Sequence, residues 1–303
     1  TGASVGKTYL YKKTDGILYY AGFLIKMNIS EADSKFIFMQ TLRQQYYDWI
    51  ISESQRSGQP GINLEQLKTY KFLSPSFIEQ QTIGTFFQNL DNLITEQKNK
   101  LENLQKVKKS MLCKMFPKEG QKVPEIRFKG FEGDWEEKRL REICILNKGK
   151  QINKQTLSDK GKYYVLNGGM TPSGYTNKYN ASGNTISISE GGNSCGYVFY
   201  NKRRFWSGGH NYTINQILLN KAYLFEYLKS NENEIMQLRI GSGLPNIQKN
   251  SLLEFKIMYP AKLSEQNFIG NFFMNLDEQI SLYQQKLEKL KNLKQSLLSK
   301  MFV

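Results

Sequence analysis

The chain has 303 residues, 39% of them hydrophobic and 13% aromatic, which is enough apolar material for two modest domain cores and excludes a disordered tail. Its 42 Lys and Arg residues against 27 Asp and Glu give a net charge of +15, so nucleic acid is favoured as the partner over a basic protein with no polyanionic ligand. The three scattered cysteines and the single histidine argue against a zinc site or a disulfide framework, and with no apolar run of about eighteen residues and no visible secretory leader we expect a cytoplasmic protein.

The first stretch, TGASVGKTYLY, comes within one residue of a nucleotide-binding P-loop, G-x-x-x-x-G-K-[ST]. Thr1 stands where the motif requires its first glycine. A P-loop also needs a helix after the lysine, whereas residues 8–11 are mostly β-branched and aromatic and favour a strand. The preferred interpretation is therefore a glycine-rich turn that leads into a strand.

The sequence contains an internal repeat. Residues 82–116, TIGTFFQNLDNLITEQKNKLENLQKVKKSMLCKMF, match residues 268–302, FIGNFFMNLDEQISLYQQKLEKLKNLKQSLLSKMF, and 186 residues separate Gly84 from Gly270. Upstream, SGQPGINLEQLKTYKFLSP matches SGLPNIQKNSLLEFKIMYP, and GASVGKTYLY matches GGNSCGYVFY. The chain is therefore organised as two related halves.

The repeat also decides between the two interpretations of the first stretch. Gly6 aligns with Gly196, but the second copy has Tyr197 and Val198 at the positions after it. A shared structural turn explains both copies, whereas ATP chemistry explains neither. A nucleotide-dependent enzyme or a nuclease would suit the positive charge, but it would require ATP binding that is lost in a Lys7→Ala variant, and we expect no such effect.

Both long repeats carry apolar residues at heptad spacing. This pattern predicts two helices, each roughly 50 Å long at about 1.5 Å per residue, that pack on each other through matching seams. The predicted helix-pairing residues are Phe87, Leu90, Ile94, Leu101, Leu104, Phe273, Leu276, Ile280, Leu287 and Leu290.

The direction of pairing follows from charge. Each copy has a lysine in the seam near its C-terminal end and an aspartate beside the seam near its N-terminal end. In an antiparallel pair Lys108 would lie level with Asp277, and Lys294 with Asp91, whereas a parallel pair would place lysine on lysine. We therefore predict antiparallel helices.

Between the helices, the prolines and glycines of FPKEGQKVPEIRFKGFEGDWEEKRLREI end the first helix. Short alternating segments and glycine-asparagine turns follow up to about residue 215 and predict strands. The stretch AYLFEYLKSNENEIMQL predicts a helix. The region is expected to be an α/β (α+β) domain with a mixed, mostly antiparallel sheet.

Taken in order, these motifs resemble one family, the DNA specificity (S) subunits of type I restriction-modification systems. The resemblance is carried by GFEGDWEEKRLREI, ISEGGNSCGYVFY, GSGLPNI, YPAKLSEQNFIGNFF and the helix end KNLKQSLLSKMF. Each motif alone is weak, but their order and their repetition make the resemblance specific over essentially the whole chain.

The resemblance implies two target-recognition domains separated by two long antiparallel coiled-coil helices, in an internal two-fold repeat. Residues 1–75 would be the C-terminal part of the first recognition domain, residues 76–118 the first conserved spacer helix, residues 119–262 the second recognition domain and residues 263–303 the second conserved spacer helix. Each domain would read one half of a bipartite DNA site, and the helices would set the distance between the halves.

The resemblance also implies that catalysis belongs to partners. Two modification (methyltransferase) subunits would use S-adenosylmethionine, and restriction subunits would use ATP and magnesium. This chain lacks an acidic helicase box, an Asn-Pro-Pro-Tyr methylation motif and a credible metal cluster, so we expect a non-catalytic recognition subunit with no cofactor of its own.

The sequence departs from the family plan at its start. In the second copy 56 residues separate Trp135 from Gly191, whereas only Thr1 precedes the matching Gly2. We expect the first recognition domain to be incomplete, as in a piece of a longer chain, and residues 1–75 to be of low stability alone. A natural half-subunit is less favoured because both helices are present.

DNA recognition requires polar side chains on loops that enter the major groove, with Lys and Arg on the flanking phosphates. About half of the candidates are expected to be ordinary loop residues that serve turns or solvent. The candidates are Lys148, Lys150, Asn153 and Lys154 in a first loop, Asn167, Thr171, Ser173, Tyr175 and Lys178 in a second, Lys202, Arg203 and Arg204 after a hairpin, and Ser242, Asn246 and Gln248 around GSGLPNIQK.

The single histidine and one alternative function complete the predictions. His210 is expected to be a hydrogen-bonded structural residue, because it has no Cys or second His to work with. A coiled-coil structural adaptor without sequence-specific DNA recognition would explain the helices but not the basic, loop-rich domain between them.

Overall fold

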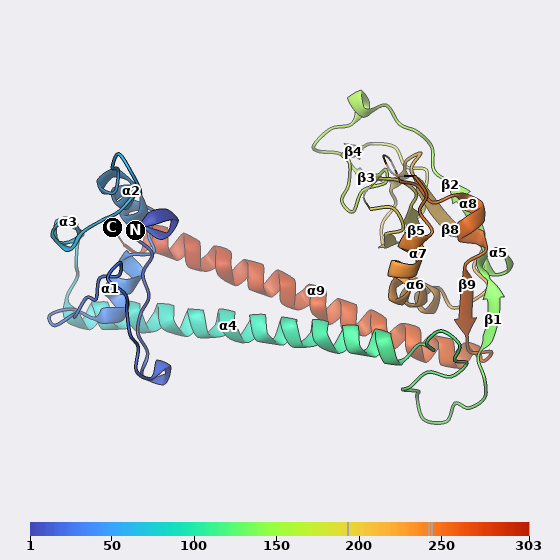
Figure 1. Ribbon diagram of the computed structural model, residues 1–303, viewed down its shortest axis with the longest axis horizontal. Helices are drawn as coiled ribbons and strands as arrows, with labels where there is room; N and C mark the ends of the chain where they lie inside the picture. Colours follow the sequence, from blue (N-terminus) through green and yellow to red (C-terminus); the bar gives the residue numbers. More distant parts are fainter. Residues whose placement is uncertain (193, 242, 244, 303) are drawn as a thin grey trace. The chain divides into compact units, whose positions relative to one another are not determined.

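The computed structural model describes residues 1–192, 194–241, 243 and 245–302, and Figure 1 labels its elements. The chain divides into two compact units, which are described separately. The first unit is Thr1–Asn103 with Ser281–Val303, and the second is Leu104–Ile280. The two long helices, α4 (Phe77–Lys114) and α9 (Leu263–Lys300), each contribute one segment to each unit. No helix of the described residues is long and apolar enough to span a membrane.

The second unit contains three small sheets. One has the order β2-β8-β5-β6, one the order β4-β3-β7, and one consists of β1 and β9. Every pair of strands is antiparallel except β3 with β7, as the sequence predicted. The strands are β1 (Glu136–Arg139), β2 (Ile145–Lys148), β3 (Tyr163–Leu166), β4 (Tyr175–Thr176), β5 (Thr185–Ser189), β6 (Val198–Asn201), β7 (Trp206–Ser207), β8 (Asn211–Asn215) and β9 (Lys256–Tyr259).

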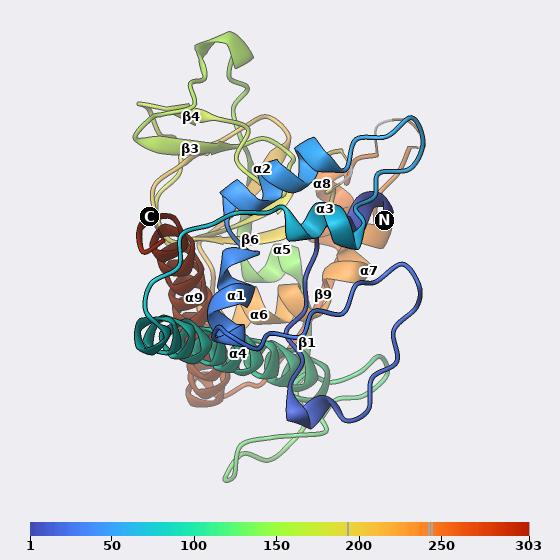
Figure 2. The ribbon, with the colours of Figure 1, turned by 90° about the vertical axis from the view of Figure 1, so that its left-hand side faces the viewer.

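The four-stranded sheet supplies one wall of the core of the second unit. Strand β5 is buried along its whole length, and its Ile186 and Ile188 lie opposite Ile214 and Tyr212 of β8. The predicted helix in this region is confirmed as α6 (Lys221–Ser230) and α7 (Glu232–Gln237). The remaining short helices are α5 (Leu140–Ile143), η3 (Lys154–Thr156) and α8 (Lys249–Leu253). Both views place β3 and β4 at the end of the second unit that lies away from its segments of α4 and α9 (Figure 1, Figure 2).

The helix segments of the second unit run antiparallel. Lys108 Nζ of α4 lies 2.6 and 2.7 Å from the two carboxylate oxygens of Asp277 of α9, which confirms the predicted pair. Beyond the end of α4, Phe116 stacks on Phe273 of α9 at a centroid distance of 5.8 Å. The apolar seam and the ion pair therefore specify the same direction.

The first unit is mainly helical in its described residues. It contains η1 (Gly2–Ser4), η2 (Lys13–Asp15), α1 (Ser34–Gln40), α2 (Gln44–Glu53) and α3 (Leu64–Lys68). Helix α1 packs on α4, where Phe36 is buried in one cluster with Phe87. Phe36 also stacks on Phe302, just beyond the end of α9, at 5.3 Å. Figure 2 shows α1 beside α4. Lys294 Nζ lies 2.5 Å from Asp91 Oδ1, which confirms the second predicted pair.

The predicted helix-pairing residues lie on the less exposed faces of α4 and α9. Phe87 and Leu90 belong to the core of the first unit, and Phe273 and Leu276 to the core of the second. The other six are partly buried, namely Ile94, Leu101, Leu104, Ile280, Leu287 and Leu290.

The internal repeat extends to single hydrogen bonds. Gln80 Oε1 accepts a bond from the backbone N–H of Asp33, and Gln266 Oε1 accepts one from the backbone N–H of Asn220, at 3.0 and 2.8 Å. Asp33 caps the N-terminus of α1, and Asn220 caps the N-terminus of α6. Each cap lies against a glycine of a long helix, so both units use the same joint between a short helix and a long one.

The predicted strand at residues 8–11 is wrong, because no regular strand forms there and Tyr9 and Tyr11 are exposed. The turn before it agrees with the structural interpretation. Gly6 has φ +76°, and a Cβ there would lie 2.6 Å from a carbon of Ile50 of α2. The matching Gly196 has φ +93°, and a Cβ there would lie 2.9 Å from Cα of Met236 in α7. Backbone conformation and close packing therefore explain both glycines.

Candidate nucleic-acid interface

The predicted DNA-binding residues lie on loops of the second unit, at the ends of β2, β3 and β6 and beside α8. Lys148 ends β2, Lys154 lies in η3, Tyr175 begins β4, and Gln248 precedes α8. Ser242 lies outside the described residues. Asn167 is partly buried. The other predicted residues are exposed, namely Lys148, Lys150, Asn153, Lys154, Thr171, Ser173, Tyr175, Lys178, Lys202, Arg203, Arg204, Asn246 and Gln248.

Strand β7 brings two of these loops together. The backbone N–H of Lys150 donates to Ser207 O at 2.9 Å, and the indole N–H of Trp206 donates to Lys150 O at 2.9 Å. Because β7 also pairs with β3, the loop after β2 lies beside the loop after β3. In that second loop Asn167 Oδ1 accepts a bond from the backbone N–H of His210 at 3.1 Å. The structure thus joins loops that lie far apart in the sequence.

Glu190 lies between these loops and was not among the residues predicted from the sequence. It follows β5, its side chain is 11% exposed, and its Oε1 accepts bonds from Lys148 Nζ and from the Tyr212 hydroxyl, both at 2.7 Å. Its backbone N–H donates to His210 O, and its backbone O accepts from the N–H of Ile247 at 2.8 Å. The side chain of Glu190 therefore joins β2 to β8, and its backbone holds the loop that precedes α8.

The sequence carried a signal for this residue. Glu190 is the one acidic residue in ISEGGNSCGYVFY, directly after an apolar strand and inside a strongly basic domain. A carboxylate in that position is costly to bury unless it gains cationic or hydroxyl partners. The partners are Tyr212 of β8, the neighbour of β5 in the sheet, and Lys148 of β2, the strand beyond it, and they could not be identified from spacing alone.

The predicted cations after the hairpin form an exposed basic group. The Arg204 guanidinium lies 4.8 Å from the centre of the Tyr179 ring, which holds it by a cation–π contact. Lys202 and Arg203 precede it in the same turn and are exposed. Cations in this arrangement can contact phosphates without giving up a buried partner.

Some of the candidates serve the fold locally. Asn153 Oδ1 accepts a bond from the backbone N–H of Gln155 and caps η3. Asn246 forms backbone bridges with Ile240 and with Gly191, which fasten its loop to the residue after Glu190. Asn153 and Asn246 therefore stabilise turns, as was expected for some of the candidates.

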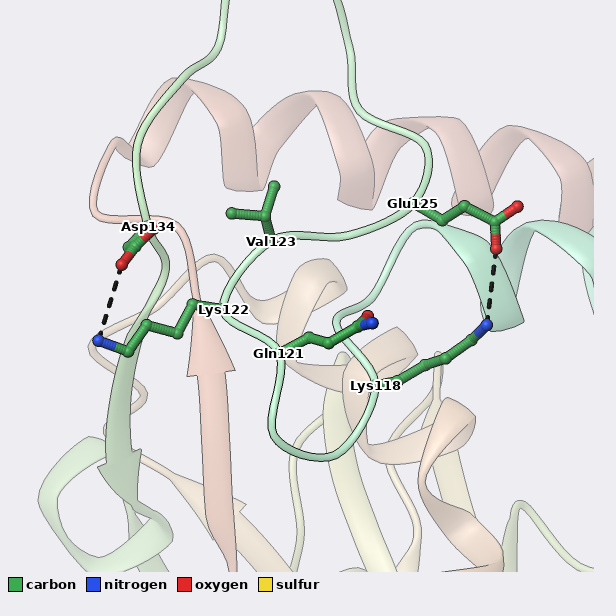
Figure 3. Close-up of a pocket in the computed structure, with 6 residues that line it drawn as sticks. All are labelled: Lys118, Gln121, Lys122, Val123, Glu125 and Asp134. Atoms are coloured by element: carbon green, nitrogen blue, oxygen red, sulfur yellow. Dashed lines mark ion pairs between the residues drawn. The ribbon is translucent and has the colours of Figure 1, made fainter.

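A surface hollow outside this cluster is formed by the segment between α4 and β1 (Figure 3). Two ion pairs cross it, Lys118 with Glu125 and Lys122 with Asp134, each at 3.6 Å. Glu125 also contacts Lys114 at 3.0 Å, and these lysines hold the pKa of its carboxyl below the ordinary value. The two lysines that line the hollow are balanced by Glu125 and Asp134, so the hollow offers no net charge to a ligand. The lining residues are Lys118, Gln121, Lys122, Val123, Glu125 and Asp134.

Clusters of metal-ligand side chains and the two buried cysteines bear on metal and thiol chemistry in the part of the chain that the structure describes. No group of three or more His, Cys, Asp or Glu side chains within it could hold a metal ion. Burial raises the pKa of the Cys144 thiol to about 12, and burial also raises that of Cys195. Both thiols therefore stay protonated and are poor nucleophiles near neutral pH.

A family model described as the type I restriction modification DNA specificity domain matches residues 1–105 and 132–292. The chain belongs to this family. The two matched ranges begin in the two halves of the internal repeat, and each includes a part of one long helix.

Several members of the specificity family are similar to this chain. Putative type I specificity subunits of Mycoplasma genitalium and Mycoplasma pneumoniae are 31% and 30% identical over 172 residues, which is 56% of this chain and 45% and 46% of theirs. The chain thus spans about half the length of these relatives. The specificity subunit of the type I restriction enzyme MjaVIII of Methanocaldococcus jannaschii is 23% identical over 98% of this chain and 76% of its own.

Solved structures share the fold. The S subunit of a type I restriction-modification system from M. genitalium matches with a TM-score of 0.70 over 90% of this chain and 73% of its own, at 20% identity. The HsdS subunit from Thermoanaerobacter tengcongensis matches with a TM-score of 0.50 over 89% of this chain and 70% of its own, at 19% identity. The predicted fold class of the specificity family is confirmed by these neighbours and by the elements of both units.

Proposed function

We propose that this chain is a DNA specificity subunit in which the loops of the second unit read one half of a bipartite DNA site. The observation that supports the proposal most directly is the position of the exposed cations. They lie on loops that belong to the matched range 132–292, and β7 brings two of these loops, those after β2 and β3, side by side. Lys and Arg at such positions bind phosphates, and Asn, Ser, Thr and Tyr beside them suit base edges.

The proposal extends to partners. The long helices would set the spacing between two half-sites and would carry two modification (methyltransferase) subunits, and restriction subunits would join that complex in the cytoplasm. Methyl transfer, DNA translocation and cleavage would belong to those subunits, with S-adenosylmethionine, ATP and magnesium as their cofactors. This chain would contribute recognition and no catalytic group.

A domain graft tests the proposal. Residues 135–260, which span the described strands of the second unit, would replace the second recognition domain of a type I specificity subunit whose bipartite motif is known. Methylated adenines would then be mapped in cells that express the graft with the modification subunit of the host protein. We expect one half of the motif to change and the other half to stay. Methylation of the unchanged host motif by the assembled graft would contradict recognition by this domain and favour the structural adaptor.

Replacing Arg204 with alanine tests the basic group after the hairpin. If Arg204 contacts a phosphate, as proposed, we expect weaker binding at all DNA sequences and a salt dependence whose slope falls by about one. The measurement is fluorescence anisotropy with duplexes of several sequences over a range of salt. Lys129→Ala, which removes an exposed cation from the segment between α4 and β1, is the control and should change neither quantity. A loss of preference at a single base pair would instead assign Arg204 to guanine.

A further inference from the structure

The second carboxylate oxygen of Glu190 has no hydrogen-bond partner among the described residues, although it is buried. Its first oxygen is bonded to Lys148 and Tyr212, so the side chain is fixed in place. A buried acceptor without a donor is destabilising, so this oxygen favours any group that can donate to it. The group nearest to satisfying it is the Nδ1 atom of His210, at 3.8 Å.

His210 faces both Glu190 and solvent. Its side chain is 60% exposed, and glycine backbone flanks the ring. A Cβ at Gly191 would lie 3.5 Å from His210 Nδ1, and a Cβ at Gly168 would lie 3.1 Å from His210 Cβ. A large polyanion can therefore approach the ring past two positions that carry no side chain.

The chemistry of imidazole limits what His210 can do between two anions. A neutral ring carries one N–H, so it can donate to the Glu190 carboxylate or to an anion in solution, but not to both. Only the imidazolium ion donates from both nitrogens. Because Nδ1 is the atom that faces Glu190, Nε2 is the atom left for the second anion.

We propose that His210 is a contact to a phosphate of the DNA backbone, and that it binds this phosphate as an imidazolium ion held from behind by Glu190. Formation of the complex then takes up a proton from solvent, and DNA binding weakens as the pH rises. This inference rests on the proposed function, because it assumes that the loops of the second unit meet DNA.

The other polar groups around His210 and Glu190 are Lys148, Asn167, Tyr212 and Cys195. Lys148 lies on the other oxygen of Glu190, and the Asn167 side chain that contacts the His210 backbone does not titrate. Burial and the bond to Glu190 raise the pKa of Tyr212, and burial raises that of the Cys195 thiol, so both remain neutral. The sequence has a single histidine, and substituting it isolates its contribution.

The test is binding of the full chain to a fluorescent duplex of mixed sequence, at low ionic strength and between pH 6 and 8.5. A mixed sequence is the right probe because phosphate contacts do not depend on sequence. We expect the Kd of the unsubstituted chain to rise by up to about tenfold per pH unit, the limit for one proton. Calorimetry in buffers of different ionisation enthalpy should detect the same proton uptake.

Three variants separate the roles. His210→Asn keeps a donor for Glu190 but cannot become charged, so its Kd should be weaker at pH 6 and independent of pH. His210→Lys should bind tightly with little pH dependence, and Glu190→Gln should reduce the pH dependence because an amide does not favour the imidazolium ion. Equal pH dependence and proton uptake in His210→Asn and the unsubstituted chain would overturn the inference while leaving DNA binding intact. Absence of duplex binding by the unsubstituted chain at every pH would overturn the proposed function as well.

Discussion

Replacing Gly270 with valine is expected to destabilise the second unit by about 3 kcal/mol, within the range for overpacking a buried joint. A Cβ at Gly270 would lie 2.8 Å from Asn220 Oδ1 and 3.0 Å from both Ala222 Cβ and the backbone nitrogen of Tyr223. These atoms form the N-terminal cap of α6, since Asn220 Oδ1 accepts the bond from the Tyr223 N–H at 2.9 Å. The side chain would therefore clash with α6 and break its cap.

The measurement is urea unfolding together with hydrogen exchange of the peptide that contains α6. Asn271→Val is the matched control, because it places the same β-branched residue at the next, exposed position of α9. Loss of protection in α6 for the glycine variant alone is the expected result. Equal stability of the two variants would mean that α6 does not depend on close approach at this glycine. Gly84→Val should act in the same way on α1, where a Cβ would lie 2.5 Å from Asp33 Oδ1.

The helices and their pairing could be predicted because the information is periodic and local. A heptad seam fixes which face of α4 and α9 is buried, and one lysine and one aspartate per helix fix the direction. The contacts Lys108–Asp277 and Lys294–Asp91 follow from these two features alone. The internal repeat adds a second, independent copy of the same pattern.

The prediction of a strand at residues 8–11 was wrong because a strand depends on a distant neighbour and not only on local sequence. Strand propensity is local, but a strand forms only with a hydrogen-bonded neighbour, and none pairs with these residues in the described chain. In the second copy Val198 and Tyr200 belong to β6, which has β5 as its neighbour. The same sequence pattern therefore gives a strand in one unit and an irregular segment in the other.

The exposed loops of the second unit could be located from the sequence, but the contacts within them could not be. Glycine and asparagine turns identify loops, whereas the Glu190 cluster depends on which strands become neighbours in the sheet. Lys148 was predicted as a DNA-binding cation, and the structure places its ammonium group on Glu190 at 2.7 Å. Its contribution to DNA binding and the other predicted contacts remain predictions.

Replacing Lys108 with methionine is expected to destabilise the second unit by about 3–5 kcal/mol at pH 8, the usual cost of leaving a buried charge without its partner. Lys108 Nζ contacts Glu226 of α6 at 3.2 Å as well as Asp277. The Glu226 side chain is 1% exposed, and burial raises the pKa of its carboxyl to about 7. The cation therefore compensates a carboxylate that water cannot reach.

The loss of stability in the Lys108 variant depends on pH because the pKa of Glu226 is raised in the folded state. The folded state binds the Glu226 proton more tightly than the unfolded state, where the ordinary value is 4.5. The stability from this group is thus fully present below pH 4.5 and is lost as the pH rises through about 7, by about 3 kcal/mol in total. The Lys108 variant should accordingly recover part of its stability at pH 5. Glu226→Gln should be more stable than the unsubstituted chain at pH 8 and should lose this part of the pH dependence.

The first unit provides the matched control for this experiment. Counting from the two helix caps, Met39 of α1 occupies the position of Glu226, and Lys294 has Asp91, with its side chain 36% exposed, as its partner. Lys294→Met should therefore cost less than Lys108→Met, about 1 kcal/mol with little change between pH 5 and 8, because Asp91, at 36% exposed, can be hydrated when its partner is removed, whereas Glu226, at 1%, cannot. Hydrogen exchange of α1 and α6 during urea unfolding assigns each loss to its unit. Equal costs and equal pH dependence for the two lysine variants would show that Glu226 is not the source of the effect, and that the aspartate pairs alone account for it.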